Sequence, residues 1–433
     1  MELYEKEVLV PLPRGGVDLL KYFSECVTAH LSDGEILLRF VVVKTDARGY
    51  HCELGVLANA LDKGNERGSI FDFQMGGSEE VEDFTVALLI PTGIGAEIGG
   101  HCGDGNAVAR LVASTCDTLI THPNVVNASD INELPENGLY VEGSVLTRLF
   151  MGQIGLQKVR SNRILMLMDR HSDRLFNDEV VNSVSAARAT LGISCDVYEM
   201  EQQVESSSVY SGSGRCVGRV EKLQRLFDVI KKHKGSYDAI GLSTFITTPL
   251  TYHKDYFTSD GMINPWGGVE AMLTHSIAEV FQLPCAHSPL MPSKEVMNME
   301  PGIVDPRKAP ETSSMTYLHC ILKGLHKSPR VVSSDRGLGV GRVSCLILPD
   351  GCLGIPTLAA LKQGIQVIAV KDREHVMKND LSSLPWRPGQ FIQVDTYLEA
   401  VGVLQAIKAG ISVESVKRPL SYTKVVEDLE VGL

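Results

Sequence analysis

The stretch that decides the fold is FTVALLI at residues 84–90, followed directly by PTGIGAEIGGHCGDGN at residues 91–106. The first part is a nearly continuous apolar run, which is typical of a strand buried on both faces of a parallel sheet. The second part carries six glycines, and glycine allows positive φ and a close approach of backbone to ligand. Because a helix is expected over residues 107–114, the stretch predicts a strand, a ligand-binding loop and a helix in succession.

The same rhythm continues along the chain and predicts an α/β fold, with a mostly parallel sheet covered by helices on both faces. Before it, the first 82 residues are expected to form a small α+β unit, and residues 83–433 the α/β body. The boundary is placed in the polar, turn-rich segment 62–81. The predicted strands are 36–43, 50–54, 118–121, 164–168, 193–198, 238–242, 343–348 and 365–370, and the predicted helices are 17–31, 178–191, 268–283 and 357–363.

Two segments interrupt this rhythm. Residues 202–218 are rich in serine and glycine and are expected to form a flexible loop. Residues 288–312 contain five prolines and predict a long irregular excursion. Long loops inside a compact body are usually lids, interface arms or disordered segments.

Composition excludes several classes of protein. With 433 residues, 44% hydrophobic and 22% charged, the chain is not expected to be disordered. No apolar run reaches the ~20 residues of a membrane helix, and a net charge of −12 argues against a nucleic-acid partner. The charged residues 1–7 show no secretory signal, so the ten scattered cysteines predict reduced thiols in the cytoplasm. An acidic surface and a proline-rich arm are compatible with a homo-oligomer.

The glycine-rich loop is expected to hold an anion, because it precedes a helix whose first amides are free donors. In an open parallel sheet, ligands bind beyond the carboxyl ends of the strands, where this loop falls. Asn106 is the expected N-cap. The spacing of Gly93, Gly95 and Gly99 departs from the dinucleotide pattern, and the phosphate-loop Lys-Ser/Thr pair is absent. Standard NAD and ATP loops are therefore disfavoured, while an unorthodox nucleotide site stays open.

Polar side chains within the loop are candidates for proton transfer. Glu97, His101 and Asp104 place two acids and a base within eight residues, and histidine is the natural proton shuttle near neutral pH. The alternative is that Asp104 caps the helix and His101 bonds backbone. His122 and Asn124 follow the next strand and should lie at the same carboxyl-end edge of the sheet, which we call the rim.

A second glycine turn, PDGCLGIPT at residues 349–357, joins a strand to a helix. Cys352 lies at this elbow, as the nucleophile does in Gly-x-Ser-x-Gly proteins, although the match is partial. A helix N-terminus would lower its thiol pKa. The alternative is a small buried side chain, with the loop amides holding a ligand oxygen. Cys102 and Cys352 together would suit a cofactor-independent racemase or epimerase.

Metal binding is a weaker prediction. Asp169, His171 and Asp173 follow a predicted strand and are candidate ligands for a divalent cation. The sequence contains no Cys-x-x-Cys pair, so a structural zinc site is not expected. Ser243 lies among four hydroxyl residues at another strand end and is either a substrate contact or a turn cap.

Three motifs resemble a family of bacterial and plant-plastid proteins known as a domain of unknown function. They are PTGIGAEIGGH at 91–101, THPN at 121–124 and YVEGS at 140–144. The resemblance extends over 84–152 and 343–370, roughly a fifth of the chain. It implies a shared α/β body and no particular activity, and it adds Glu142 to the rim candidates.

The leading hypothesis is an enzyme acting on a small anionic metabolite that carries a carboxylate or phosphate. His101 with Glu97 or Asp104 would move protons, and Cys352 is the candidate nucleophile. A nucleotide-cofactor oxidoreductase and a non-catalytic metabolite sensor remain alternatives, and no cofactor is specified. The residues expected to contact the ligand are Thr92, Gly93, Gly95, Gly99, Gly100, Asn106, His122, Asn124, Glu142, Ser243, Gly351 and Gly354.

Overall fold

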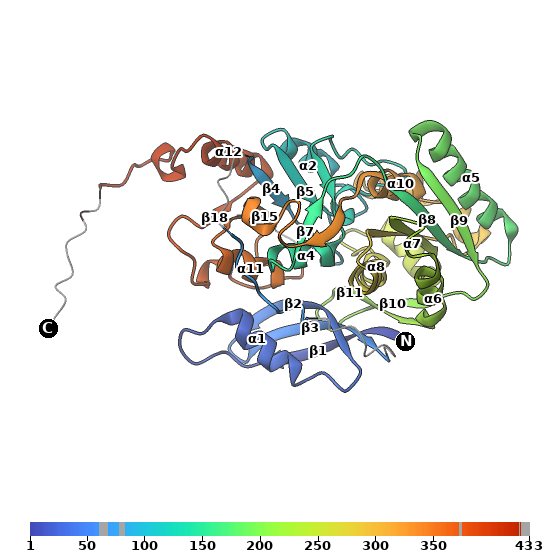
Figure 1. Ribbon diagram of the computed structural model, residues 1–433, viewed down its shortest axis with the longest axis horizontal. Coiled ribbons are helices and arrows are strands. Elements are labelled where there is room, and N and C mark those ends of the chain that lie inside the picture. Colours follow the sequence, from blue (N-terminus) through green and yellow to red (C-terminus); the bar gives the residue numbers. More distant parts are fainter. Residues whose placement is uncertain (60–67, 78–82, 372–374, 424, 426–433) are drawn as a thin grey trace.

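The computed structural model describes residues 1–59, 68–77, 83–371, 375–423 and 425. The fold is α/β, as the sequence predicts, and it combines parallel sheets with an antiparallel one (Figure 1). The predicted parallel strands divide between two sheets rather than forming one.

The first parallel sheet has the strand order β18-β17-β15-β4-β5-β6, and every neighbouring pair is parallel. The chain enters it at β4, continues outward through β5 and β6, and returns on the other side of β4 with β15. The topological switch point therefore lies between β4 and β15, where ligands bind in open α/β sheets. The strands are β4 Thr85–Leu88, β5 Thr118–Thr121, β6 Gly138–Tyr140, β15 Val343–Pro349, β17 Gln366–Val370 and β18 Phe391–Val394.

Two pairs of helices cover this sheet. Helix α2 (Asn106–Ala113) contacts α12 (Tyr397–Lys408), and α4 (Gly143–Phe150) contacts α11 (Ile355–Gln363). In Figure 1 the strands lie between the two pairs. Strands β4 and β15 are buried along nearly their whole length, which explains their continuous apolar sequences.

The second parallel sheet has the order β13-β12-β8-β9. Helix α5 (Arg174–Leu191) packs on β9, and α10 (Leu318–Lys327) packs on β12 and β13. The strands are β8 Arg163–Asp169, β9 Ser194–Met200, β12 Ala239–Thr244 and β13 Cys285–Pro289.

The third sheet is built around the N-terminal strands and has the order β10-β11-β1-β3-β2-β16. Its strands β10, β11 and β16 come from the body, so the sheet extends beyond the first 82 residues. Half of the predicted boundary at 62–81 lies outside the described residues. The strands are β1 Glu2–Val10, β2 Ile36–Asp46, β3 Gly49–Ala58, β10 Glu205–Tyr210, β11 Cys216–Glu221 and β16 Leu353–Gly354, and α1 is Leu19–Thr28.

The prediction of a flexible loop at 202–218 is wrong, because β10 and β11 form a hairpin there. Ser206 and Ser208 are buried, and the Ser206 hydroxyl donates to the carbonyl of Phe245. The serine run forms a strand because its backbone pairs with β11, which in turn pairs with β1. Composition alone does not register this long-range pairing.

Helix α8 (Gly267–Phe281) lies between the layers, where it contacts β11, β13 and α4. Residues 288–312 are largely irregular, as predicted, apart from the end of β13, the short α9 (Lys294–Met297) and a 3₁₀ turn at Ala309–Thr312. Among the described residues, no helix is both long and apolar enough to cross a bilayer. The remaining α-helices and strands are α3 Pro123–Val126, α6 Leu223–His233, α7 Leu250–Thr258, β7 Ile154–Gln157 and β14 Arg330–Ser333.

Candidate active site

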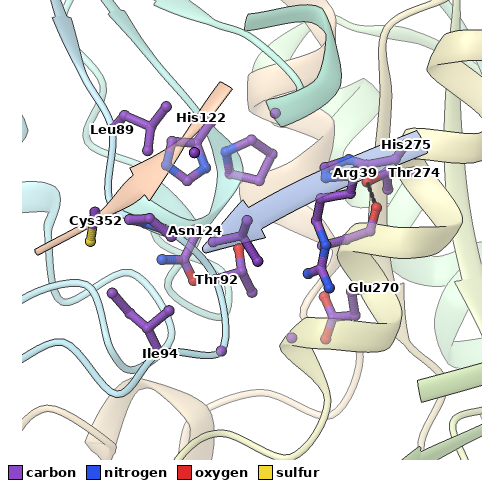
Figure 2. A pocket seen from close by; sticks show the side chains of 18 of the residues that line it. Arg39, Leu89, Thr92, Ile94, His122, Asn124, Glu270, Thr274, His275 and Cys352 are labelled. Atoms are coloured by element: carbon purple, nitrogen blue, oxygen red, sulfur yellow. Dashed lines mark hydrogen bonds between the residues drawn. The ribbon is translucent and has the colours of Figure 1, made fainter. Parts of the chain in front are cut away.

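A cavity of about 220 Å³ lies at the switch point of the first sheet. The loops that follow β4, β5, β6 and β15 line it, because parallel strands bring their carboxyl ends to one edge. Strand β2 and helix α8 close it from the other layers (Figure 2). Two glycine-rich segments separated by some 250 positions thus contribute to one cavity.

The predicted site residues fall into two groups. Those that line the cavity are Thr92, Gly93, Gly100, His101, His122, Asn124, Glu142, Cys352 and Gly354. Those that do not are Gly95, Glu97, Gly99, Asp104, Asn106, Ser243 and Gly351. Glu97 is exposed on the surface of the loop.

Several polar side chains of the loop hold its own backbone. Asp104 accepts the Gly99 N–H at 2.7 Å, and burial raises its pKa to about 7 against the effect of such bonds. Asn124 donates to the carbonyls of Ile90 (3.0 Å) and Gly99 (2.7 Å). These bonds fix the glycine-rich loop over the end of β4, so Asp104 is a structural residue of the loop.

Asn106 is not the N-cap that the sequence predicts. Helix α2 begins at Asn106 and its N-cap is Gly105, which has no side chain to accept a bond. The Asn106 amide instead donates to the carbonyls of Gly103 and Val126, both at 2.9 Å. It therefore ties the loop after β4 to the loop after β5.

His101 is buried and bonded through one ring nitrogen. Its Nδ1 lies 3.0 Å from the hydroxyl of Tyr256, and that hydroxyl donates to Glu311 at 2.7 Å. Burial, with the charges of Arg307 and Lys308, lowers the pKa of His101 to about 4. The ring is therefore neutral at physiological pH and can accept a proton.

His122 is also a neutral, buried histidine. Its Nε2 accepts the Ile90 N–H at 3.1 Å, so the ring proton is on Nδ1. Burial lowers the pKa of His122 to about 4, against the attraction of Glu142. His122 therefore offers the cavity a hydrogen-bond donor rather than a base.

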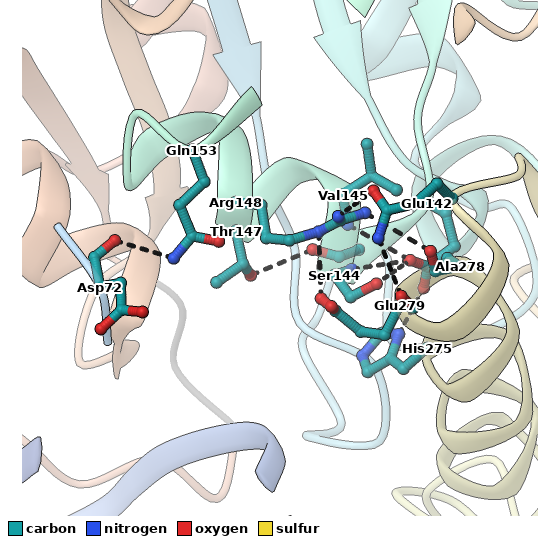
Figure 3. A network of polar contacts seen from close by, with 12 residues as sticks. Asp72, Glu142, Ser144, Val145, Thr147, Arg148, Gln153, His275, Ala278 and Glu279 are labelled. Atoms are coloured by element: carbon teal, nitrogen blue, oxygen red, sulfur yellow. Dashed lines mark hydrogen bonds and ion pairs between the residues drawn. The ribbon is translucent and has the colours of Figure 1, made fainter. Parts of the chain in front are cut away.

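Glu142 is the N-cap of α4 and the centre of a polar network (Figure 3). One carboxylate oxygen accepts from the Ser144 N–H at 2.9 Å and hydroxyl at 2.5 Å, and the other bonds His275 and Thr274. Burial alone would raise the pKa of Glu142, but His275 and these donors lower it to about 2. Glu142 is thus a permanent anion that orients His275 beside the cavity.

Cys352 lines the cavity but is 4% exposed. The turn that carries it is held by its neighbours: Leu353 and Gly354 form β16 and pair with β2, and Thr357 donates to the Cys352 carbonyl at 2.8 Å. Gly351 has φ of +83°, which explains the glycine there. Helix α11 starts at Ile355, so Cys352 precedes its N-cap by two residues.

Two arginines that the sequence does not single out also line the cavity: Arg39 on β2 and Arg215 beside β11. Arg39 pairs with Glu5, and the fully buried Arg215 pairs with Glu53. Burial and the charge of Arg215 lower the pKa of Arg39. Among the described residues, Arg39 Nε and Arg215 Nη2 are buried without a hydrogen-bond partner.

A second cavity of about 530 Å³ adjoins the first, and the proline-rich excursion forms much of its lining. Glu270 and His287 line both cavities, with Nδ1 of His287 3.7 Å from the Glu270 carboxylate. Figure 2 shows Arg39 and Glu270 on facing elements of the first cavity. The site thus contains buried bases, fixed anions and guanidinium groups next to one another.

The candidate metal ligands have other roles. Asp169 accepts the N–H groups of Val204 and Phe245, and Asp173 caps α5. His171 accepts the Asp173 N–H at 2.7 Å. Within the described residues, no group of three or more His, Cys, Asp and Glu side chains is placed to hold a metal ion. Ser243 is buried inside β12, away from the first cavity.

Fold and site define an α/β protein with a cavity lined by polar side chains at the switch point of a six-stranded parallel sheet. The chain belongs to a family described as proteins of unknown function, DUF3326, whose model matches residues 85–417. This confirms the resemblance noted in the sequence. An uncharacterized lipoprotein of Synechococcus sp. is 33% identical over 359 residues, which cover 78% of this chain and 95% of that protein. No solved structure matches the chain.

The sequence analysis does not identify four residues in or near the two cavities, although two of them have a feature in the sequence that could have pointed to them. Arg39 is the single charge in the apolar run 36–43, which is unusual for a buried strand. Glu311 lies in the proline-rich excursion, a segment whose length already suggests a role. Arg215 and Tyr256 lie in segments with no local motif.

Proposed function

We propose that this protein is an enzyme that binds a small anionic metabolite, carrying a carboxylate or phosphate, and moves a proton on it. The observation that carries the proposal is the placement of Arg39 and Arg215 in the same cavity as the neutral base His101. Buried guanidinium N–H groups without an acceptor are costly, and an oxyanion would satisfy them.

In this proposal the groups that bind the anion differ from those predicted from the sequence. The sequence assigns the anion to the amides of two glycine loops. The structure supports guanidinium groups, because Arg39 and Arg215 present fixed charges, while β16 ties the elbow after Cys352 to β2. The glycine-rich loop then serves to bring His101 over the end of β4.

The racemase alternative gains one observation, since Cys102 and Cys352 line the same cavity. Against it, the Cys102 thiol donates to the Asn127 carbonyl at 3.0 Å, and burial raises its pKa well above the usual range. Thiolate formation is therefore costly at Cys102, and His101 is the better base.

The test is binding measured by calorimetry on the wild type and matched variants. A panel of small carboxylates, inorganic phosphate and neutral amides is compared, after native mass spectrometry of the purified protein for a co-purified molecule. Arg39→Gln should weaken binding of the anion about tenfold or more. Arg148→Gln is the control, because Arg148 is also buried and ion-paired, to Glu279, but does not line the cavity.

Equal affinities of Arg39→Gln and the wild type for every anion would contradict the proposal. Binding of nicotinamide cofactors would instead support the oxidoreductase alternative. An anion that binds tightly but is never turned over, with His101→Ala leaving affinity unchanged, would support the sensor.

We also propose that the protein works in the cytoplasm with reduced thiols. All ten cysteines are free, and most are buried. The name of the Synechococcus relative describes that protein as a lipoprotein. Fractionation of cells into cytoplasm and membrane tests the point, and recovery of the chain in the membrane would contradict it.

A further inference from the structure

Three side chains connect the two cavities. His101 lines the first cavity, Glu311 lines the second, and Tyr256, fully buried, bonds both. Nδ1 of His101 lies 3.0 Å from the Tyr256 hydroxyl oxygen, which lies 2.7 Å from Glu311 Oε1. The Cys102 N–H also donates to Oε1 at 3.2 Å. The chain of bonds is continuous from one cavity to the other.

The directions of these bonds fix the proton on His101. An ionised Glu311 only accepts, so the Tyr256 hydroxyl donates to it. The Tyr256 oxygen can then only accept from His101, which puts the ring proton on Nδ1. Nε2 keeps its lone pair and has no hydrogen-bond partner among the residues that the structure describes. That nitrogen is the one left for a molecule in the first cavity.

We propose that His101, Tyr256 and Glu311 form a proton relay, which carries a proton from a substrate in the first cavity to a carboxylate in the wall of the second. The inference rests on the proposed function and names the path that the proton follows. Nε2 of His101 takes the proton from the substrate, and the Nδ1 proton passes to the Tyr256 oxygen. The Tyr256 proton passes to Glu311 at the same time.

The transfer changes the charge of two groups, the substrate and Glu311, and leaves His101 and Tyr256 neutral. The substrate has lost a proton, Glu311 has gained one, and His101 has exchanged its Nδ1 proton for one on Nε2. No imidazolium is formed, which suits a ring whose buried surroundings, with Arg307 and Lys308 nearby, oppose a positive charge. In histidine–carboxylate pairs of proteases, by contrast, an imidazolium does form.

Glu311 is suited to accept the proton near neutral pH. Burial, with the nearby charges of Glu270 and Asp104, raises its pKa to about 7, although the bonds from Tyr256 and the Cys102 amide lower it. Lys308 holds the backbone that carries Tyr256 by donating to the carbonyls of Tyr256 (2.6 Å) and Ser259 (2.7 Å). The relay is therefore rigid in the middle and titrates at its end.

The test is the position of the proton on the His101 ring, read by ¹⁵N NMR of histidine-labelled protein. The His101→Gln variant assigns the signals among the twelve histidines. At about pH 8, where Glu311 is ionised, the wild type should carry the proton on Nδ1. Below about pH 6, protonated Glu311 donates to Tyr256, Tyr256 donates to Nδ1, and the ring proton should move to Nε2.

Two variants and a control separate the relay from ordinary packing. Glu311→Gln keeps an oxygen in place of Oε1, and the ring should keep its Nδ1 proton across this pH range. Tyr256→Phe removes the acceptor, and the ring proton should move to Nε2 at high pH as well. Tyr317→Phe is the control: Tyr317 donates to the backbone carbonyl of Glu311 at 3.1 Å, outside the relay, and the switch should persist.

A wild-type ring with its proton on Nε2 at about pH 8, or one that does not switch near the pKa of Glu311, overturns the relay. A switch that survives in Glu311→Gln overturns it as well, because the titrating group would then be another one. These outcomes need no substrate. Loss of anion binding in Arg39→Gln is a separate measurement, so failure of the relay and failure of the proposed function are distinguishable.

Discussion

Two buried glutamates beside the cavity have opposite protonation behaviour. Glu142 is 3% exposed and Glu311 is 8% exposed. The pKa of Glu142 is lowered to about 2, whereas that of Glu311 is raised to about 7. Burial raises both values, so their surroundings make the difference.

The donors around each carboxylate explain the contrast. Glu142 accepts from the first turn of α4, where the helix dipole adds positive potential, and it pairs with His275. Among the described residues, the donors to the Glu311 carboxylate are neutral, chiefly Tyr256 and the Cys102 amide, and like charges lie nearby. Glu142 therefore stays ionised at neutral pH, whereas Glu311 exchanges a proton near neutral pH. The predictions below test whether this division of roles holds.

The largest effect is expected from Glu142→Gln. It removes the charge that pairs with His275 and weakens the cap of α4, so the free energy of unfolding should fall by about 3 kcal/mol. Urea unfolding followed by circular dichroism measures it. Glu136→Gln is the control, because Glu136 forms a fully exposed pair with Lys327 and its substitution should cost far less than that of Glu142. Equal costs in the two variants would contradict the fixed-anion role.

The next effect is a difference in pH dependence between the wild type and Glu311→Gln. The pKa of Glu311 is raised in the folded protein, so its contribution to stability is present below about pH 4.5 and is lost as the pH rises to about 7. The unfolding free energy of the wild type relative to the variant should fall by about 2 to 3 kcal/mol over that window.

The stability contribution of Glu142 depends on pH in the opposite direction to that of Glu311. Its stabilising contribution is present above the ordinary glutamate pKa and is lost as the pH falls towards about 2. His101 and His122 also lose stability as the pH falls, through about 4, but both remain in the Glu311 variant and cancel in the difference. If the difference in unfolding free energy between the wild type and Glu311→Gln stays constant between about pH 4.5 and 7, the pKa of Glu311 is not raised in the folded protein.

The sequence predicts most of the fold because its signals are local. The apolar strands at 84–90 and 343–348 and the helix at 178–191 correspond to β4, β15 and α5 within a few residues. Where pairing is long-range, as for the hairpin at 205–221, composition points to a loop instead. The division of the parallel strands into two sheets leaves no local trace at all.

The candidate site is predicted in part for the same reason. His101, His122 and Cys352 follow strands directly, so the rule for the carboxyl ends of a parallel sheet brings them to one edge. Arg39 reaches the first cavity from a different sheet, and Glu311 lines the adjoining second cavity from an irregular excursion. Their contribution depends on how layers stack, which periodicity along one segment does not encode.

The smallest effect is expected from Ser144→Ala. Its hydroxyl is one of several donors to Glu142, and the Ser144 N–H still caps the carboxylate, so the loss should be about 1 kcal/mol. Ser185→Ala is the matched control, because its exposed hydroxyl bonds only the helix carbonyl of Val181 and should change stability by about 0.5 kcal/mol or less. If Ser144→Ala costs as much as Glu142→Gln, the hydroxyl rather than His275 and the helix keeps the carboxylate ionised. If it costs no more than Ser185→Ala, the bond to His275 and the amides of α4 suffice to keep the carboxylate ionised, and the contrast with Glu311 reduces to the pairing of Glu142 with His275.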